Sequence, residues 1–160
     1  MPRAASGTGT LNAHSTAEVM ALEQEAGERQ RPVWIVEDEP NVGMLAAEIC
    51  ESFGAVPTLF RAPLSFLLAL RGPTMPSAVI LDWRLANELS SGLFLATRHR
   101  FRGMPVIYWT NSPEGLPAVI RDDELTQVVD KQGGVEPLER ALGWAFEQTE
   151  PVRAQPPEGS

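Results

Sequence analysis

The sequence contains little lysine and little cysteine. Of its 13 basic residues 12 are arginine, so Lys131 is the single lysine. The one cysteine, Cys50, permits no disulfide within the chain and leaves no thiolate cluster for zinc, which favours a reducing compartment. Long apolar runs are also missing: none reaches the roughly 18 residues of a membrane-spanning helix, and the first 30 residues lack the apolar stretch of a signal peptide. These absences predict a cytoplasmic protein without a membrane partner.

The charge balance is acidic. With 21 acidic and 13 basic side chains among 160 residues, the formal net charge is -8. This balance disfavours nucleic acid or an anionic membrane surface as the main partner. The length suits one domain of ordinary size.

Both ends of the chain differ in composition from its centre. Residues 1–14 are small and polar, and Ser15 with Glu18 forms a capping box ahead of a short helical pattern at 16–29. We therefore expect residues 1–30 to form a flexible arm with a short helix, which leaves a homodimer open. The proline-rich residues 151–160 predict a disordered tail. The compact domain is expected over residues 31–150.

Strand-like and helix-like patterns alternate five times between these ends. Short apolar runs predict strands, and longer runs with a helical period predict helices. The expected strands are Val33–Val36, Ala55–Phe60, Ala78–Leu81, Pro105–Trp109 and Leu125–Val129. The expected helices begin at Pro40, Pro63, Ser91, Pro113 and Val135, and the last is expected to end at Gln148. This order predicts an α/β fold with a parallel sheet between two layers of helices. Pro57 cannot donate to a sheet ladder, so the second strand should lie at an edge.

Polar side chains follow four of the five expected strands. Glu37 and Asp38 follow the first, Asp82 the third, Thr110 the fourth and Lys131 the fifth. Ligands of such sheets bind beyond the carboxyl ends of the strands, so these side chains should share one rim. Three converging carboxylates repel one another unless a hard cation such as Mg²⁺ neutralises them. An aspartate in that setting can act as a nucleophile toward phosphorus.

These residues, in this order, resemble the receiver domain of two-component response regulators. The resemblance covers about residues 32–148 and includes the string VILDWRL around Asp82 and the pair Gly92-Leu93. It implies a flavodoxin-like (βα)5 sheet with strand order 2-1-3-4-5, as in single-domain receivers of the chemotaxis-regulator type.

The resemblance also implies a role for each residue at the rim. Asp82 would accept a phosphoryl group from a sensor histidine kinase or a histidine phosphotransfer protein. Glu37 and Asp38 would hold Mg²⁺ together with Asp82 and the backbone carbonyl of Arg84. The phosphoryl group would contact Thr110 and Lys131. Arg84 and Ser112 would tune the lifetime of the phosphorylated state. The protein would then be a signalling phosphoacceptor rather than an enzyme, read by a downstream protein that the sequence does not name.

The sequence departs from the family pattern at three positions near this rim. Gln132 stands where a proline is usual, Val128 where an aromatic residue is common, and Asn111 where a small residue is typical. These departures motivate an alternative, a receiver-like binding module that works without phosphorylation.

Other interpretations of the same residues remain open at this stage. Acids 37–39 could simply stabilise a helix start, and Thr110 could be a turn residue. An aspartate-based phosphatase commonly has a second acid where Arg84 stands, which disfavours that reaction. A flavodoxin-like flavin site would require phosphate next to acids 37–39, which would repel it.

Overall fold

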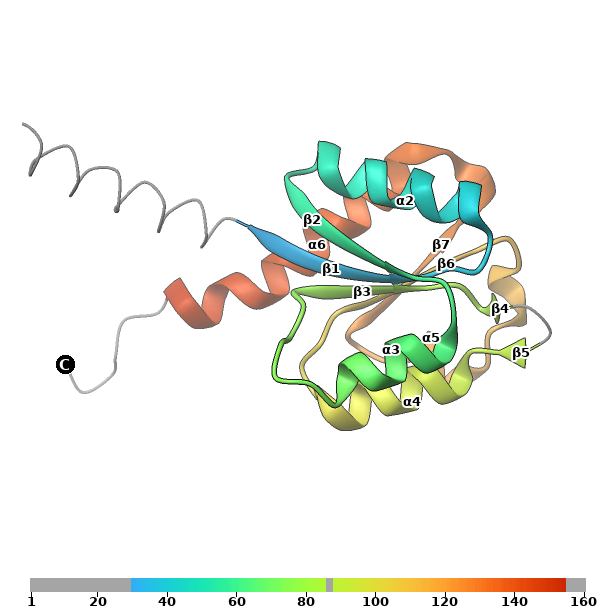
Figure 1. Ribbon diagram of the computed structural model, residues 1–160. Helices are drawn as coiled ribbons and strands as arrows, with labels where there is room; N and C mark the ends of the chain where they lie inside the picture. Colours follow the sequence, from blue (N-terminus) through green and yellow to red (C-terminus); the bar gives the residue numbers. More distant parts are fainter. Residues whose placement is uncertain (1–29, 86–87, 155–160) are drawn as a thin grey trace, which may run out of the picture. The chain divides into compact units, whose positions relative to one another are not determined.

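A central parallel sheet organises the chain (Figure 1). The computed structural model describes residues 30–85 and 88–154, with side chains up to residue 149. The sheet has five strands in the order β2-β1-β3-β6-β7, all of them parallel to their neighbours. The strands are β1 (Arg31–Val36), β2 (Ala55–Phe60), β3 (Ala78–Leu81), β6 (Val106–Thr110) and β7 (Thr126–Asp130). Counted along the sheet, this is the expected order 2-1-3-4-5, and Pro57 lies on the edge strand as predicted.

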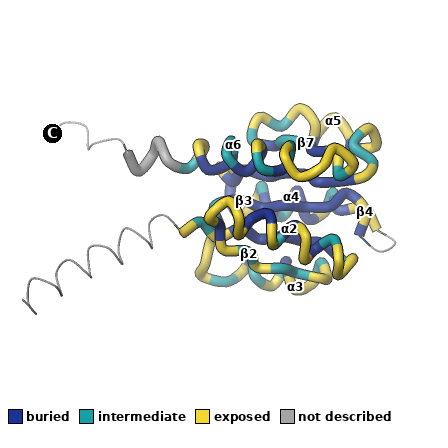
Figure 2. Tube along the Cα trace, turned by 90° about the horizontal axis from the view of Figure 1, so that it is seen from above, coloured by how far each residue is buried: buried dark blue, intermediate teal, exposed yellow. Residues whose placement is uncertain are grey.

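Helices cover both faces of the sheet. Helices α2 (Pro40–Ser52) and α6 (Val135–Ala154) lie on one face, and α3 (Pro63–Leu70), α4 (Ser91–Arg100) and the short α5 (Ala118–Arg121) lie on the other (Figure 1). The strands in the middle are buried, whereas the outer sides of the helices are exposed (Figure 2). This arrangement is the predicted α/β fold.

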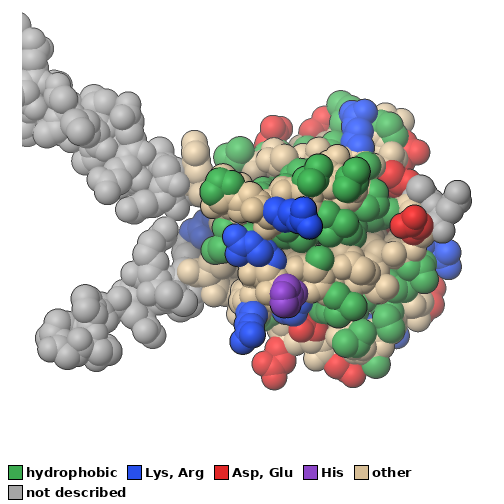
Figure 3. All heavy atoms as spheres, turned by 60° about the horizontal axis from the view of Figure 1, so that its bottom comes forward, with side chains coloured by type: hydrophobic (Ala, Val, Ile, Leu, Met, Phe, Trp, Pro, Cys, Tyr) green, Lys and Arg blue, Asp and Glu red, His purple; other side chains and the backbone are tan. Residues whose placement is uncertain are grey.

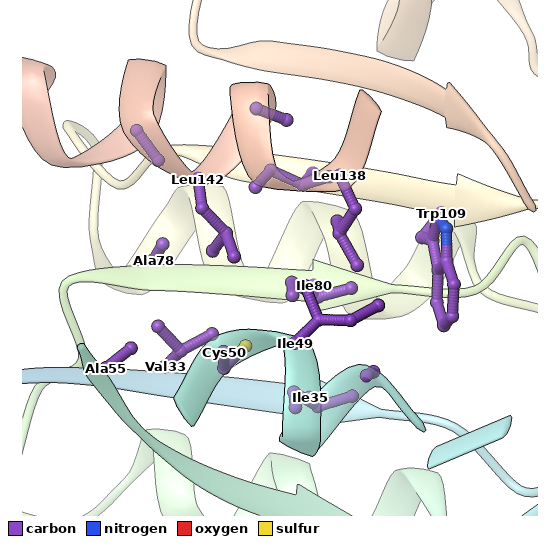
Figure 4. Packing of buried hydrophobic residues seen from close by; sticks show 14 of the residues in the cluster. Val33, Ile35, Ile49, Cys50, Ala55, Ala78, Ile80, Trp109, Leu138 and Leu142 are labelled. Atoms are coloured by element: carbon purple, nitrogen blue, oxygen red, sulfur yellow. The ribbon is translucent and has the colours of Figure 1, made fainter. Parts of the chain in front are cut away.

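Alternate residues of each central strand enter two separate cores. Val33 and Ile35 of β1 face α2 and α6, whereas Trp34 and Val36 face the other helix layer. The first core is mainly aliphatic and includes Cys50, whose burial raises the pKa of its thiol to about 12 (Figure 4). The second core is richer in aromatic side chains. Two-sided burial explains why these strands lack polar alternation in the sequence.

Three features differ from the expected pattern. A small antiparallel hairpin, β4 (Arg84–Leu85) with β5 (Glu88–Leu89), lies between Asp82 and α4, where the sequence predicted no strand. The weak helix expected from Pro113 is split into a 3-10 turn, η1 (Pro113–Gly115), and α5, because Pro117 interrupts the helical hydrogen bonds. Strand β7 is followed by a second 3-10 turn, η2 (Lys131–Gly133).

The carboxyl-terminal helix is longer than the sequence predicted. Helix α6 continues to Ala154, past the expected end at Gln148 and into the segment expected to be a tail. The expected helix at 16–29, the arm before it and residues 155–160 lie outside the described residues. Among the residues that the structure describes, no helix is long and apolar enough to cross a membrane.

Candidate functional site

The carboxyl ends of β1 and β3 bring three acidic side chains together. Val36 and Leu81 are partners in the sheet, so Glu37 and Asp82 emerge side by side. Backbone hydrogen bonds fix both residues: the Glu37 amide donates to Phe60 at 3.0 Å and the Asp82 amide to Val36 at 3.3 Å. One carboxylate oxygen from each of Glu37, Asp38 and Asp82 lies within 4.8 Å of the other two. We call these three residues the acid pocket.

Lys131 closes the acid pocket from the end of β7. Its Nζ donates to Glu37 Oε1 at 2.8 Å and to Asp82 Oδ2 at 2.9 Å. The side chain is only 10% exposed, so the ammonium lies between the carboxylates rather than in solvent. The same Nζ lies 5.3 Å from the centroid of the Trp109 ring. The single lysine of the chain is therefore held by two acids and an aromatic face.

Burial and charge act in opposite directions on this pair. Desolvation raises the pKa of Glu37, and the hydrogen bond from Lys131 offsets this rise only in part. Burial would lower the pKa of Lys131, but the hydrogen bonds to Asp82 and Glu37 outweigh it and raise that pKa. The ammonium thus stays charged and supplies the positive charge that the crowded carboxylates need.

The three acidic residues between β1 and α2, Glu37, Asp38 and Glu39, make different contacts. Glu39 caps α2, because its Oε1 accepts from the Asn41 amide at 3.3 Å. Glu37 is 3% exposed and points to Lys131, and Asp38 also faces the acid pocket. Glu37 also contributes to the helix start, because its Oε2 accepts from the Glu39 amide at 3.2 Å while its Oε1 accepts from Lys131.

Thr110 lies at the carboxyl end of β6 and is 1% exposed. Its Oγ1 accepts a hydrogen bond from the Ser112 amide at 3.1 Å, which is the turn contact that its position before Pro113 suggested. Arg84 approaches the pocket through its backbone: its amide lies 3.4 Å from Asp82 Oδ1. The five rim residues named from the sequence thus follow the ends of four neighbouring strands, and the contacts join Lys131, Glu37 and Asp82 directly.

Two polar features near the rim were not predicted. Asp130 accepts from the Gln132 amide at 2.9 Å and so stabilises the turn after Lys131. A proline at position 132 has no amide hydrogen and could not make this bond. Trp109 is 3% exposed, and its indole Nε1 is buried without a hydrogen-bond partner.

A second network joins Tyr108 of β6 to Ser90, the residue that precedes α4. The Tyr108 hydroxyl and Ser90 Oγ lie 3.3 Å apart, and the same hydroxyl lies 3.3 Å from the Ser90 carbonyl oxygen. Burial raises the pKa of Tyr108, which keeps its hydroxyl protonated. Trp83 packs edge-on against the Tyr108 ring, with centroids 6.2 Å apart. Tyr108 is the sheet partner of Val128, so an aromatic side chain stands one strand away from the position expected to carry one.

The acid pocket suits a hard divalent cation. Its donors are three carboxylate oxygens, the ligand type that Mg²⁺ prefers, and a lysine offsets part of their charge. No such group contains thiolate or imidazole ligands among the residues that the structure describes, which disfavours softer metals there.

Comparison with solved structures finds chains of similar fold. A response regulator receiver domain protein from Clostridium thermocellum matches with a TM-score of 0.65, at 13% identity over 76% of this chain and 98% of that one. A receiver protein from Sinorhizobium medicae matches with a TM-score of 0.61, at 14% identity over 74% of this chain and 95% of that one.

The chain has the receiver-domain fold. A third match is the response regulator protein TrrA from Thermotoga maritima, solved in complex with Mg²⁺ and BeF. It has a TM-score of 0.58 and 18% identity, and the match covers 72% of this chain and 98% of that one. No family model and no curated protein sequence matches the chain. The similarity to receiver domains is therefore one of structure, and at these sequence identities it shows the fold.

Proposed function

We propose that this receiver domain accepts a phosphoryl group on Asp82 in a Mg²⁺-dependent reaction. One observation carries the proposal: the lone lysine bridges Glu37 and Asp82 while Asp38 completes a three-carboxylate cluster. A cluster of acidic side chains alone does not distinguish a functional site from an ordinary charged surface. A buried cation placed between two of them, from the end of a different strand, is an arrangement that phosphoryl transfer needs.

In the proposed reaction, a carboxylate oxygen of Asp82 attacks the phosphorus of a phosphohistidine on a histidine kinase or phosphotransfer protein. The new O–P bond makes an acyl phosphate, and the N–P bond breaks with its electron pair going to the imidazole, which takes up a proton. Glu37, Asp38, Asp82 and the Arg84 carbonyl would hold Mg²⁺, which when bound offsets the negative charge of the incoming phosphoryl oxygens. TrrA, solved with Mg²⁺ and BeF, is a relative in fold in which those two species are present.

The chain's own residues complete the site. Lys131 would exchange its contact with Asp82 for a phosphoryl oxygen, which its flexible stem permits. Thr110 would donate its hydroxyl to another phosphoryl oxygen, giving up its contact to the Ser112 amide for a new position of the β6 end. Arg84 and Ser112, two residues beyond the acceptor and the threonine, would adjust access of water to the acyl phosphate.

The output of this reaction would be a change in partner binding. Added charge at the rim would bias the position of Thr110 and of the loop that carries Trp83, and a downstream protein would bind one of the two states better. The protein would act as a signalling phosphoacceptor, with no turnover of a small-molecule substrate.

A phosphorylation-independent binding module is the second candidate. Val128 supports it, because an aliphatic side chain stands where receivers commonly carry the aromatic partner of the switching threonine. In this case partner binding would be unaffected by Asp82→Asn, whereas the first proposal expects the phosphorylation response to disappear.

The test is phosphorylation of the full chain by a small-molecule phosphodonor such as acetyl phosphate, followed by intact mass spectrometry. We expect the mass of one added phosphoryl group in the presence of Mg²⁺, and loss of that product on chelation of the metal or in Asp82→Asn. Asp122→Asn is the matched control, because Asp122 is an exposed acid beside α5 and lies outside the acid pocket. Equal labelling of the wild type and Asp82→Asn would refute the proposal.

A further inference from the structure

The face formed by α3 and α4 contains an apolar groove. It encloses about 610 Å³ between the two helices. Its floor is aliphatic, and two arginines and a histidine stand at the carboxyl ends of the helices. The lining residues are Leu64, Leu67, Leu68, Leu70 and Ala96, with Arg71, His99 and Arg100. In Figure 3 hydrophobic side chains gather on this face, and the basic and histidine side chains lie beside them.

Several of these leucines are exposed to an unusual degree. Leu64 is 67% exposed and Leu68 57% exposed, and Leu95 on the neighbouring helix is 57% exposed. Helix α3, with the sequence PLSFLLAL, has no charged residue at all. A contiguous apolar surface on a helix pair loses contact with water only when something covers it, which marks an interaction site.

The charge around the groove is opposite to that of the chain. No acidic residue lines it, although the net charge of the chain is -8. Arg100 is held in place, since its Nε donates to the Leu70 carbonyl at 2.9 Å and its guanidinium lies over the Phe101 ring at 4.6 Å. A rim that is basic and positioned, on an otherwise acidic protein, is complementary to a partner that carries carboxylates.

The groove continues toward the hairpin. A second hollow of about 230 Å³ shares Leu67 and includes Leu85, Leu89 and Leu93. Glu88 also lines this hollow, so the apolar surface has basic groups at one end and an acid at the other. Such polarity can fix the direction in which an extended ligand lies.

The shape and charge of the groove favour one kind of binding partner over the others. A second copy meeting the same patch would oppose one hollow with another and leave both unfilled. Nucleic acid would bring phosphates against an aliphatic floor, and the net charge of the chain would oppose it. A helix, in contrast, fits a groove between two helices, and the eight residues of α3 match about 12 Å of partner, or two to three turns.

We propose that the α3–α4 groove binds an amphipathic helix of a partner protein, with its aliphatic face on the leucines and its carboxylates against Arg71, His99 and Arg100. This inference stands apart from the proposed phosphoryl chemistry, because no residue of the acid pocket lines the groove.

The test uses the full chain and two labelled helical peptides of about 16 residues. One carries leucines along one face and glutamates beside them, and in the other every glutamate is replaced by lysine. Fluorescence anisotropy should show the acidic peptide binding at least about 10-fold more tightly than the basic one. Leu68→Glu should weaken binding by about 10-fold, and Arg71→Glu by several-fold with a reduced dependence on salt.

Val119→Glu is the matched control. Val119 is 62% exposed on α5 and lies outside the groove, so this variant adds the same charge to another helix of the layer and should bind as the wild type does. Urea unfolding of Leu68→Glu establishes that its fold is kept. The proposal is overturned if neither peptide binds, if both bind equally, or if Leu68→Glu binds normally. It is also overturned if sedimentation shows a dimer that Leu68→Glu dissociates, or if the groove variants lose binding to anionic vesicles instead.

Discussion

The acid pocket and the α3–α4 groove depart from the usual burial of side chains in opposite directions. In the pocket, charged groups are withdrawn from water: Glu37 is 3% exposed and the Lys131 side chain 10%. In the groove, apolar groups face water, and Leu64 is 67% exposed. Soluble domains tend to avoid both arrangements, because buried charge and exposed apolar surface each raise the free energy of the folded state.

The two departures are compensated differently. In the pocket, the charges of Lys131, Glu37 and Asp82 are partnered within the molecule by the two ion pairs that join them. The leucines of the groove have no such partner among the described residues that line it, which is why we infer a binding partner there. Local conflicts of this kind concentrate at functional sites. The two regions therefore differ in whether the compensation lies within the chain.

The largest expected effect is on the pocket. Lys131→Met removes the ammonium and leaves Glu37 facing Asp82, so the free energy of unfolding should fall by about 3 kcal/mol without metal, as measured by urea denaturation. Added Mg²⁺ should stabilise this variant more than the wild type, since the cation restores the missing positive charge. Unchanged stability of Lys131→Met would mean that the ion pairs contribute nothing.

Lys131→Arg tests shape rather than charge at the same position. A planar guanidinium cannot follow the path of a compact ammonium between two carboxylates, so phosphorylation by the small-molecule donor should drop although the positive charge remains. Single-turnover labelling rates give the measurement. A rate equal to that of the wild type would show that any cation suffices there.

A smaller effect on stability is expected at the contact between Tyr108 and Ser90. Tyr108→Phe removes the hydroxyl and should lower the free energy of unfolding by about 1 kcal/mol. A double-mutant cycle with Ser90→Ala should give an interaction energy of about 0.5 kcal/mol or more, because the two side chains bond each other. Additive effects would show that Tyr108 on β6 and Ser90 before α4 are not coupled.

The smallest effect on stability is expected in the groove. Leu68→Ala and Leu64→Ala should change the free energy of unfolding by no more than about 0.5 kcal/mol, because both side chains are already largely in water. The same variants should weaken binding of the acidic peptide to the groove. A large loss of stability would show that these leucines serve the core and would remove the contrast with the pocket.

Much of the fold could be predicted from local patterns. Four-residue apolar runs such as Ala78–Leu81 identify strands buried on both faces, and Pro57 identified the edge strand correctly. The pocket followed from the same rule, because residues after parallel strands meet at one edge. Lys131 stood out through composition, and its contacts with Glu37 and Asp82 agree with the expectation of a shared rim.

The remaining features depend on contacts between distant segments. The β4–β5 hairpin has only two residues in each strand, too few for a periodic signal. The Ser90–Tyr108 contact joins residues 18 positions apart, and no pattern in either segment announces it. The groove was also missed, since the sequence predicted a helix from Pro63 without indicating which of its leucines are exposed. Hydrophobic sequence alone does not distinguish surface covered by the chain itself from surface left for another molecule.

The most direct measurement is the position of the phosphoryl group. After labelling with Mg²⁺ and a phosphodonor, borohydride reduction converts an aspartyl acyl phosphate to homoserine, and tandem mass spectrometry of peptides locates it. We expect homoserine at position 82 and unmodified residues at Asp38 and Asp122. Reduction product at Asp38 or Asp122, or no product at position 82 in a chain that has gained phosphate, would contradict it.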